Sequence, residues 1–277
     1  AVYPPQNVTD EQKQTLIDYT IRLAKGLNIV GLLNIQYVIS EGQVYVLEVN
    51  PRSSRTVPFL SKITGVPMAN LAMKGILGET LKNKGYETGL IKESKNVYTK
   101  VPVFSFQKLK DVDTTLGPEM KSTGEVMGSD ENLEKSLYKG LISAGIKVKD
   151  QGSVLFTISG AAKEEAYGLA KRFSDLGYHI MATKGTARYF EEKGLRVETV
   201  GKIEEEGKYE HDVLGLIYKG LVDMVINTAA KKKTARNDGF KIRRAASEQE
   251  IACLTSLDTT DALLKVLESI SFNVSSI

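Results

Sequence analysis

Residues 153–183 decide the fold class, and they read SVLFTISGAAKEEAYGLAKRFSDLGYHIMAT. The apolar run at 154–158 predicts a buried strand, and residues 163–176 carry apolar side chains at helical spacing. Gly177 then ends the helix, and residues 178–182 predict a second strand. Strand, helix and strand in this order are typical of a parallel βαβ unit, so the stretch predicts an α/β domain.

The same alternation continues towards the C-terminus. Further strands are predicted at 197–200, 224–226 and 251–254, and further helices at 213–219 and 261–270. A parallel sheet with helices on both faces accommodates all of these elements. The second half of the chain is therefore predicted to be a doubly wound parallel-sheet domain.

The first half of the chain has a different, mixed pattern. Thr9 and Gln12 form a capping box ahead of an amphipathic helix. Two strands are predicted after it, at 30–39 and 44–49, and residues 41–43 between them predict a three-residue hairpin loop. This part of the chain is therefore predicted to be an α+β segment.

Later signals in the first half lead to a predicted domain boundary. Pro67 starts one helix, and Ser129 is expected to cap another. Residues 147–152 read KVKDQG, a short polar stretch that ends in glycine. The sequence therefore predicts one domain over 1–150 and a second over 151–277.

Composition narrows the class of protein. The chain has 277 residues, of which 42% are hydrophobic and 26% charged, enough for about two globular domains. A net charge of +3 favours neither a nucleic-acid partner nor a membrane partner, and no apolar run approaches the roughly 18 residues of a membrane span. The single cysteine, Cys253, indicates a reducing compartment, so a cytoplasmic location is expected. The first residue is Ala1 rather than Met, just ahead of a helix, and we expect the chain to be cut from a longer protein.

Polar side chains on the predicted hairpin form a candidate cation site. With a three-residue loop, Gln36 faces Glu48 across the ladder, and Asn50 lies two residues further along the same face. Amide and carboxylate oxygens suit Mg²⁺, and a single carboxylate implies that phosphate oxygens complete its shell. Arg52 and Arg55 follow directly, and guanidinium groups suit phosphate. The alternative is a solvated polar face on an edge hairpin.

Loops after three predicted strands of the second half carry residue types that bind anions. The carboxyl ends of parallel strands lie at one edge of a sheet, where loop amides and helix N-termini attract phosphate. Helix capping is the alternative for the two threonines, and a solvated loop is the alternative for the lysines at 231–233. The candidate residues are Lys163 after the first strand, Thr183 and Thr186 after the second, and Asn227 and Thr228 after a later one.

The first half also carries a specific resemblance. Residues 47–59 read LEVNPRSSRTVPF, residues 61–67 read SKITGVP and residues 116–128 read LGPEMKSTGEVMG. These strings resemble the end of the second ATP-grasp half in the large subunit of carbamoyl phosphate synthetase, the half associated with carbamate phosphorylation. The resemblance covers most of residues 1–150.

This resemblance implies roles for the hairpin residues. Gln36, Glu48 and Asn50 are the implied ligands of Mg²⁺ or Mn²⁺ beside ATP, the first two also lying near the nucleotide. Arg52 is the implied phosphate contact during phosphoryl transfer, with Arg55 beside it. A complete ATP-grasp domain also has a glycine-rich lid and an adenine pocket upstream of such a segment. The 277 residues are therefore expected not to turn over ATP by themselves.

The second half resembles the methylglyoxal-synthase-like allosteric domain of the same large subunit. The matching strings are ATKGTA at 182–187, VINT at 225–228, IRRAA at 242–246 and DTT at 258–260. Arg243 and Arg244 stay open between a nucleotide contact and a salt-bridged helix face. By motif position the resemblance implies six contacts to an effector nucleotide, UMP or IMP: Lys163, Thr183, Thr186, Lys202, Asn227 and Thr228.

Together the resemblances predict the C-terminal part of the large subunit of a glutamine-dependent carbamoyl phosphate synthetase, an ATP-dependent ligase of pyrimidine or arginine biosynthesis. A glutamine amidotransferase small subunit is the implied partner. Residues 100–103 lack the carboxylate of ornithine-responsive relatives, which favours the pyrimidine type. Two alternatives remain: a stand-alone regulatory nucleotide-binding module, and a methylglyoxal-synthase-type lyase, whose Gly-Gly-Asp motif is absent here.

Overall fold

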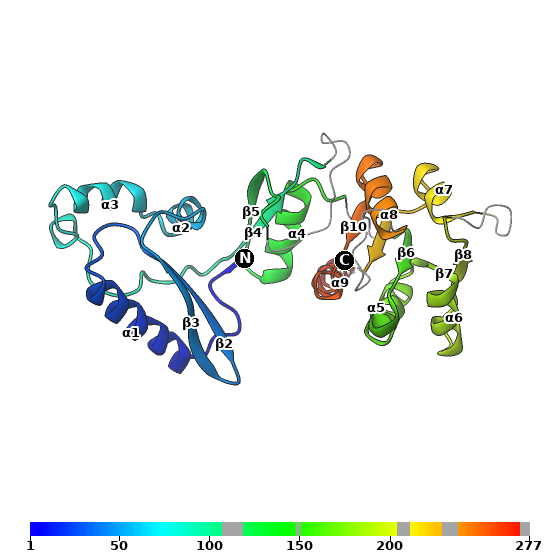
Figure 1. Ribbon diagram of the computed structural model, residues 1–277, viewed down its shortest axis with the longest axis horizontal. Coiled ribbons are helices and arrows are strands. Elements are labelled where there is room, and N and C mark those ends of the chain that lie inside the picture. The colour runs from blue at the N-terminus through cyan, green and yellow to red at the C-terminus, as the bar shows by residue number, and fades with distance from the viewer. Residues whose placement is uncertain (107–118, 148, 150, 204–210, 229–237, 272–277) are drawn as a thin grey trace, which may run out of the picture. The chain divides into compact units, whose positions relative to one another are not determined.

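The computed structural model covers residues 1–277 and describes all of them except 107–118, 148, 150, 204–210, 229–237 and 272–277. The chain divides into two compact units, residues 1–100 and 101–277 (Figure 1). The predicted domain boundary at 150 stays a prediction.

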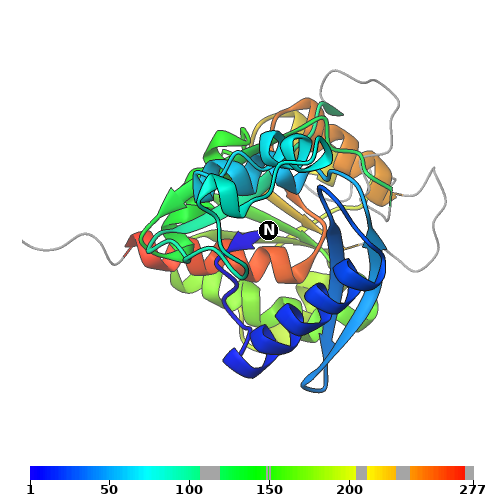
Figure 2. The ribbon, with the colours of Figure 1, turned by 90° about the vertical axis from the view of Figure 1, so that its left-hand side faces the viewer.

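The first unit consists of helices around a two-stranded hairpin. Thr9 caps the first helix, and its side chain and that of Gln12 form the predicted capping box, which is confirmed. That helix packs against the hairpin, as Figure 2 shows. The elements are β1 (Val2–Tyr3), α1 (Asp10–Gly26), β2 (Asn34–Ser40), β3 (Gln43–Asn50), α2 (Thr56–Thr64), α3 (Met68–Ile76) and a 3₁₀ turn at Lys82–Lys84.

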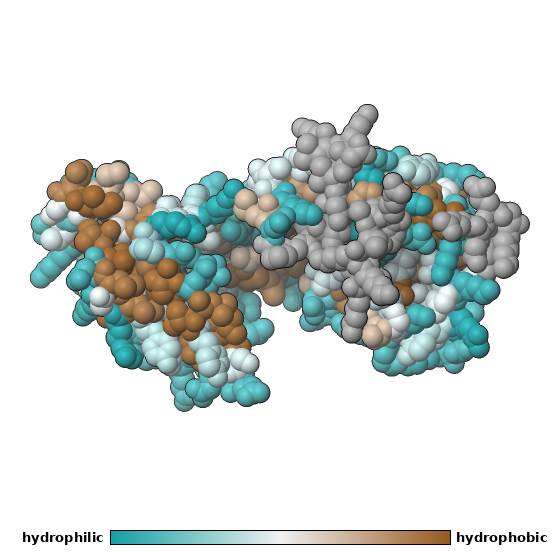
Figure 3. Space-filling view, viewed as in Figure 1, coloured by the Kyte–Doolittle hydropathy of each residue, from teal (hydrophilic) through white to brown (hydrophobic). Residues whose placement is uncertain are grey.

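The first unit buries very few side chains. All of residues 1–100 are described, and only Phe59 and Thr99 among them are buried. Large apolar side chains stay exposed instead, including Leu47 on the hairpin and Leu77 after α3. Figure 3 shows apolar residues gathered on one face of this unit. The helices and the hairpin therefore share little interior.

A strand, β4 (Val97–Val103), runs across the division at 100. β1 pairs with its first part in antiparallel register, with Tyr3 opposite Tyr98. The second unit continues with β5 (Gly124–Asp130) and α4 (Leu133–Ser143). The predicted cap at Ser129 is wrong, because this residue lies in β5 and Asn132 caps α4 by accepting a hydrogen bond from the backbone N–H of Lys135.

The rest of the second unit is the predicted doubly wound domain. Its five strands are all parallel, in the order β10-β9-β6-β7-β8, which confirms the fold class. The elements are β6 (Ser153–Thr157), a 3₁₀ turn (Gly160–Ala162), α5 (Lys163–Asp175), β7 (His179–Thr183), α6 (Lys184–Glu192), β8 (Glu198–Val200), α7 (Val213–Tyr218), β9 (Met224–Asn227), α8 (Asp238–Glu248), β10 (Ala252–Leu254) and α9 (Leu257–Ser271).

Side-chain alternation along the strands produces a separate core on each face of the sheet. Val154 and Phe156 of β6 join one cluster with residues of α4, α5, α6 and α9. Leu155, between them, joins the other cluster with residues of α7 and α8. All three side chains are fully buried. Because both faces are covered, an apolar run such as residues 154–158 is what a central parallel strand requires.

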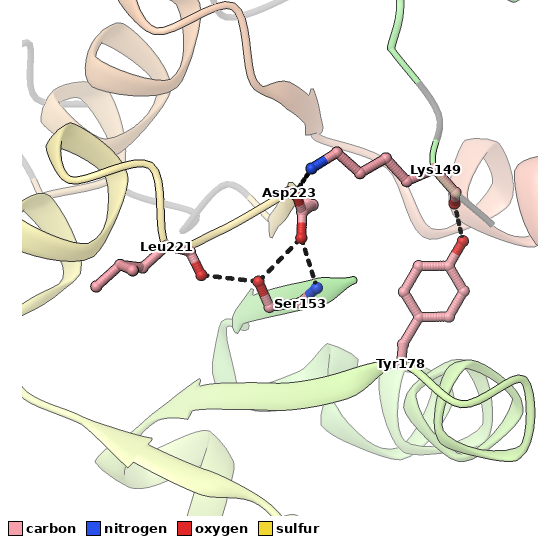
Figure 4. Close-up of polar contacts among 5 residues, drawn as sticks. All are labelled: Lys149, Ser153, Tyr178, Leu221 and Asp223. Atoms are coloured by element: carbon pink, nitrogen blue, oxygen red, sulfur yellow. Dashed lines mark hydrogen bonds and ion pairs between the residues drawn. The ribbon is translucent and has the colours of Figure 1, made fainter. Parts of the chain in front are cut away.

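A polar cluster closes the amino-terminal edge of this sheet (Figure 4). The carboxylate of Asp223 accepts hydrogen bonds from the backbone N–H of Ser153 at 2.8 Å and from its hydroxyl at 3.2 Å, and pairs with Lys149 at 2.5 Å. Tyr178 donates a hydrogen bond to the carbonyl of Lys149. A Cβ at Gly152 would clash with the Asp223 side chain, so a larger residue here would displace that carboxylate. These contacts hold the segment that precedes β6 against the segment that precedes β9.

No helix within the described part of the chain is both long and apolar enough to cross a membrane.

Candidate functional site

The carboxyl ends of the parallel strands bring the predicted anion-binding residues to one edge of the sheet. Thr157, at the end of β6, lies opposite Asn227, at the end of β9. On the other side, Phe156 pairs with Ala182 of β7, so Thr183 ends beside Thr157. Thr183 pairs with Val200 of β8, and Lys202 follows that strand two residues later. Four strand ends therefore meet at the edge where the effector site is predicted.

Lys163 lies at the start of α5 and reaches the next loop. Its Nζ donates a hydrogen bond of 2.5 Å to the carbonyl of Gly185. A Cβ at Gly185 would lie 3.5 Å from that Nζ, an ordinary contact, so the glycine is not required by this approach. The ammonium group is therefore held between the loops that follow β6 and β7, at the edge where an anion would bind.

A neighbouring cluster braces α5 against α6. The carboxylate of Glu164 accepts hydrogen bonds from Lys193 and from the Tyr189 hydroxyl, and these two contacts lower the pKa of Glu164 below its usual value. The Lys193 ammonium lies 5.1 Å from the ring centroids of both Tyr167 and Tyr189. The Nζ of Lys163 lies 6.0 Å from the Tyr189 ring centroid. The cluster therefore supports Lys163 from the side of α6.

The two threonines of the second loop have different environments. Thr183 is the N-cap residue of α6, yet its side chain makes no capping hydrogen bond. Thr186 is buried, and its Oγ1 accepts a hydrogen bond from the backbone N–H of Ile158 at 3.3 Å. The Thr186 hydroxyl thus joins the loop after β6 to α6. The Thr186 hydroxyl therefore has a structural contact, whereas the Thr183 hydroxyl lies at the N-terminus of α6.

Thr228 is linked to a residue that sequence reasoning did not assign. Its Oγ1 accepts a hydrogen bond of 3.0 Å from the backbone N–H of Ser159, and the two hydroxyls lie 3.4 Å apart. Ser159 follows β6 directly, and a serine just before a helix is a signal that could have indicated it. The lysines at 231–233 lie outside the described residues.

Asn227 is buried and satisfied inside the protein. Its Nδ2 donates to Thr157 Oγ1 at 2.6 Å, and its Oδ1 accepts from Arg243 Nη1 at 2.8 Å. Thr157 is a further residue that sequence reasoning did not assign, whereas Arg243 was expected either to contact a nucleotide or to lie on a salt-bridged helix face. Arg244 instead pairs with Glu248 at 2.7 Å along α8, so of the two interpretations of this residue the structure favours the salt-bridged helix face.

The hairpin of the first unit differs from the prediction in its turn. The predicted loop at 41–43 is wrong: Glu41 and Gly42 form a two-residue turn, both with positive φ, and Ser40 pairs with Gln43. A bulge at Leu47 then shifts the register by one residue. The two differences compensate each other, so that Gln36 still pairs with Glu48 as predicted.

The predicted metal ligands do share one face of this hairpin. Gln36 lies directly opposite Glu48, as expected, and the Nδ2 of Asn50 donates to the Glu48 carboxylate at 2.8 Å. Asn34, opposite Asn50, adds a fourth polar side chain that sequence reasoning missed, although it stands two residues before Gln36 on the same strand. One carboxylate with three amides is a donor set that fits Mg²⁺ or Mn²⁺ only together with other oxygen ligands.

The two predicted arginines flank the end of this face. Arg52 is exposed and donates through Nη1 to the carbonyl of Ser53 at 3.0 Å, and Arg55 is exposed at the start of α2. Within the described residues, no group of three His, Cys, Asp or Glu side chains could hold a metal ion. A metal ion on this face would therefore need the side-chain amides as ligands, together with oxygen atoms from a bound molecule.

Comparisons with known proteins match both halves of the chain. Residues 165–255 match a family model described as MGS-like domain, which agrees with the five-stranded parallel sheet found there. Residues 1–84 match the model described as carbamoyl-phosphate synthase L chain, ATP binding domain. The two matches, in this order, confirm the resemblance to the C-terminal part of a carbamoyl phosphate synthetase large subunit.

Among solved structures, one described as "Crystal structure of ForH" is similar at 21% identity. The alignment covers 43% of this chain and 78% of that chain, with a TM-score of 0.31. At this TM-score the likeness carries no argument about the fold or the site.

Proposed function

We propose that this chain contributes the carbamate-phosphorylating and regulatory parts of a glutamine-dependent carbamoyl phosphate synthetase. In this proposal its MGS-like sheet binds UMP or IMP, and the bound nucleotide controls the ligase. The observation that carries the proposal is the meeting of Lys163, Thr183 and Thr228 at the carboxyl edge of a sheet that matches the MGS-like model. A glutamine amidotransferase small subunit is the proposed partner of the whole enzyme.

The phosphate of the effector would lie between the loops after β6, β7 and β9. The ammonium of Lys163 offsets the negative charge, and the first backbone N–H groups of α6 point towards the same edge. The hydroxyls of Thr183 and Ser159 supply further donors. The site thus combines the Lys163 ammonium with several neutral donors, which suits a phosphate monoester.

The hairpin would serve the ligase half. Gln36, Glu48 and Asn50 would hold Mg²⁺ or Mn²⁺ through their side-chain oxygens, with phosphate oxygens of ATP completing the shell. The metal, when bound, offsets negative charge on the phosphoryl group that passes to carbamate. Arg52 and Arg55 would orient the phosphates through their planar guanidinium groups.

A second candidate function is a stand-alone nucleotide-binding module. It is favoured by the contrast in burial, because the sheet of the second unit has a complete core on each face whereas the first unit buries only two side chains. A lyase of the methylglyoxal-synthase type has less support, since the strand end at 227 carries a buried amide where those enzymes carry a carboxylate.

Isothermal titration calorimetry of the chain with UMP and with IMP tests the proposal. We expect saturable heat with at least one nucleotide, and a loss of affinity of about tenfold or more in Lys163→Ala, since a charged hydrogen-bonding group is removed. Lys171→Ala is the matched control, because Lys171 is an exposed lysine on the same helix. Absence of heat with both nucleotides would contradict the effector assignment, and methylglyoxal production from dihydroxyacetone phosphate would favour the lyase.

A further inference from the structure

Arg243 is a buried guanidinium at the carboxyl ends of the central strands. It lies on α8, where Ile242, Ala245 and Ala246 also face the core, and only 7% of its surface is exposed. Its Nη1 donates to the side-chain oxygen of Asn227, whose own exposed fraction is 3%. Burial of a charged group is unfavourable in free energy, so a guanidinium buried against an amide points to a specific role for this contact.

The contact fixes the orientation of the Asn227 amide. A guanidinium carries donors only, so the atom of Asn227 that faces Arg243 has to be the oxygen. The Nδ2 group then faces Thr157 Oγ1 and donates to it at 2.6 Å. The hydrogen bonds therefore run in one direction, from Arg243 through Asn227 to Thr157.

The direction of these hydrogen bonds decides whether the Thr157 hydroxyl can act as a donor or as an acceptor towards a ligand. Because Thr157 Oγ1 accepts from Asn227, its own hydroxyl hydrogen is left to donate onwards. If the amide were reversed, Thr157 would donate inwards and present its lone pairs at the edge. Lone pairs repel a phosphate oxygen, whereas an O–H donor attracts it.

We propose that Arg243 is a positioning residue that fixes this hydrogen-bond direction and so makes the edge of the sheet selective for a phosphate anion. The proposal rests on the proposed function, because the ligand is the phosphate of the effector nucleotide. Arg243 acts through Asn227 and Thr157. Its neighbour Arg244 lies on the same helix but pairs with Glu248.

A double-mutant cycle on UMP binding tests the proposal with the full chain, using calorimetry. We expect Arg243→Met and Thr157→Val each to weaken UMP binding about tenfold, the scale of one lost hydrogen bond to a charged group. The double variant should bind no more than about threefold more weakly than the weaker single variant, because both changes break one chain of contacts. Lys241→Met, which removes an exposed charge from the same helix, should bind like the wild type.

Conservative variants of Arg243 distinguish an effect of hydrogen-bond direction from an effect of side-chain packing. Lysine is also a donor only, so Arg243→Lys should bind UMP within about threefold of wild type, whereas Arg243→Gln, which can also accept, should lose about tenfold. This pair also serves if Arg243→Met does not fold.

Four other results would overturn the proposal about Arg243. Fully additive losses in the cycle, or equal affinity of the Lys and Gln variants, overturn the proposal. If the wild type binds UMP and Arg243→Met binds it equally well, the proposal about Arg243 is overturned, whereas the proposed function stands. No UMP or IMP binding by the wild type overturns the proposed function and this proposal with it.

Discussion

The hairpin of the first unit and the parallel sheet of the second place their candidate sites on very different supports. Gln36 and Glu48 lie on an exposed two-stranded ribbon. Asn227 and Thr157 lie at the ends of strands whose side chains are buried on both faces. A two-stranded hairpin is marginal by itself in water, whereas a covered five-stranded sheet is not.

The difference concerns how each site is held in place. The sheet fixes its loops by packing, so that residues from four strand ends meet at one edge. The hairpin fixes only which side chains face each other, through the register of one ladder. We therefore expect the sheet to bind an effector by itself, whereas the proposed metal site on the hairpin would need the oxygen atoms of a nucleotide as further ligands.

The largest expected effect is on the core of the sheet. Phe156 is fully buried and packs edge-to-face on Phe173 and Phe190, with ring centroids 6.1 and 5.6 Å away. Phe156→Ala should lower the free energy of unfolding by about 3–5 kcal/mol, measured by urea denaturation. Leu47→Ala, on the exposed bulge of the hairpin, is the control and should change it by less than about 0.5 kcal/mol. Equal losses would contradict the contrast between the two regions.

Hydrogen exchange compares the two regions directly. Backbone amides of β6 and β9 should exchange at least about 100-fold more slowly than those of β2 and β3, because the hairpin can open locally without disturbing a core. Mass spectrometry of peptic fragments measures both regions in one sample. Similar protection in the hairpin and the sheet would show that the hairpin has a stable interior of its own.

A smaller effect concerns the amino-terminal edge of the sheet. Burial alone would raise the pKa of Asp223, but Lys149 and the donors of Ser153 outweigh burial, so that its pKa lies below the usual value. The carboxylate therefore stabilises the fold at pH values above its unfolded pKa of about 4, and this contribution is lost as pH falls through the lower folded pKa.

The variant Asp223→Asn isolates this contribution. At pH 7 it should lower the free energy of unfolding by about 1 kcal/mol relative to wild type. The difference should shrink as the pH falls below about 4. Urea denaturation of both proteins between pH 7 and pH 3 provides the measurement, and a difference independent of pH would show that the Asp223 charge has no role.

The sheet could be predicted from sequence because burial on both faces leaves a clear pattern. The strand expected at 224–226 is found at Met224–Asn227, and the helix expected at 163–176 is found at Lys163–Asp175. A short, uninterrupted apolar run bounded by turn residues is typical of a strand that helices cover on both sides. The fold of this half therefore follows from local patterns alone.

The hairpin turn could not be predicted in the same way. Glu41 adopts a positive φ, which is uncommon for glutamate, so the sequence favoured a longer loop. The bulge at Leu47 has no signature in residue type either. The pairing of Gln36 with Glu48 was predicted correctly because these two irregularities cancel.

The structure brings the predicted effector contacts to one edge of the sheet, but the hydrogen bonds among them were not predicted. Loop position after a strand indicates Lys163 and Thr183 as candidates, whereas it gives no indication of which way a side chain turns. Thr186 and Asn227 turn inwards, and Arg243 occupies the buried face of a helix where a charge is unexpected. These contacts depend on α8 packing on β9, which is a tertiary feature.

The central claim is that a nucleotide phosphate binds at the carboxyl edge of the parallel sheet, and hydrogen exchange with and without saturating UMP tests it most directly. We predict slower exchange in peptides that contain residues 157–163 and 183–190, and no change at 151–153 or 221–223, at the opposite edge. Protection at the opposite edge, or no change anywhere in the sheet, would contradict the claim.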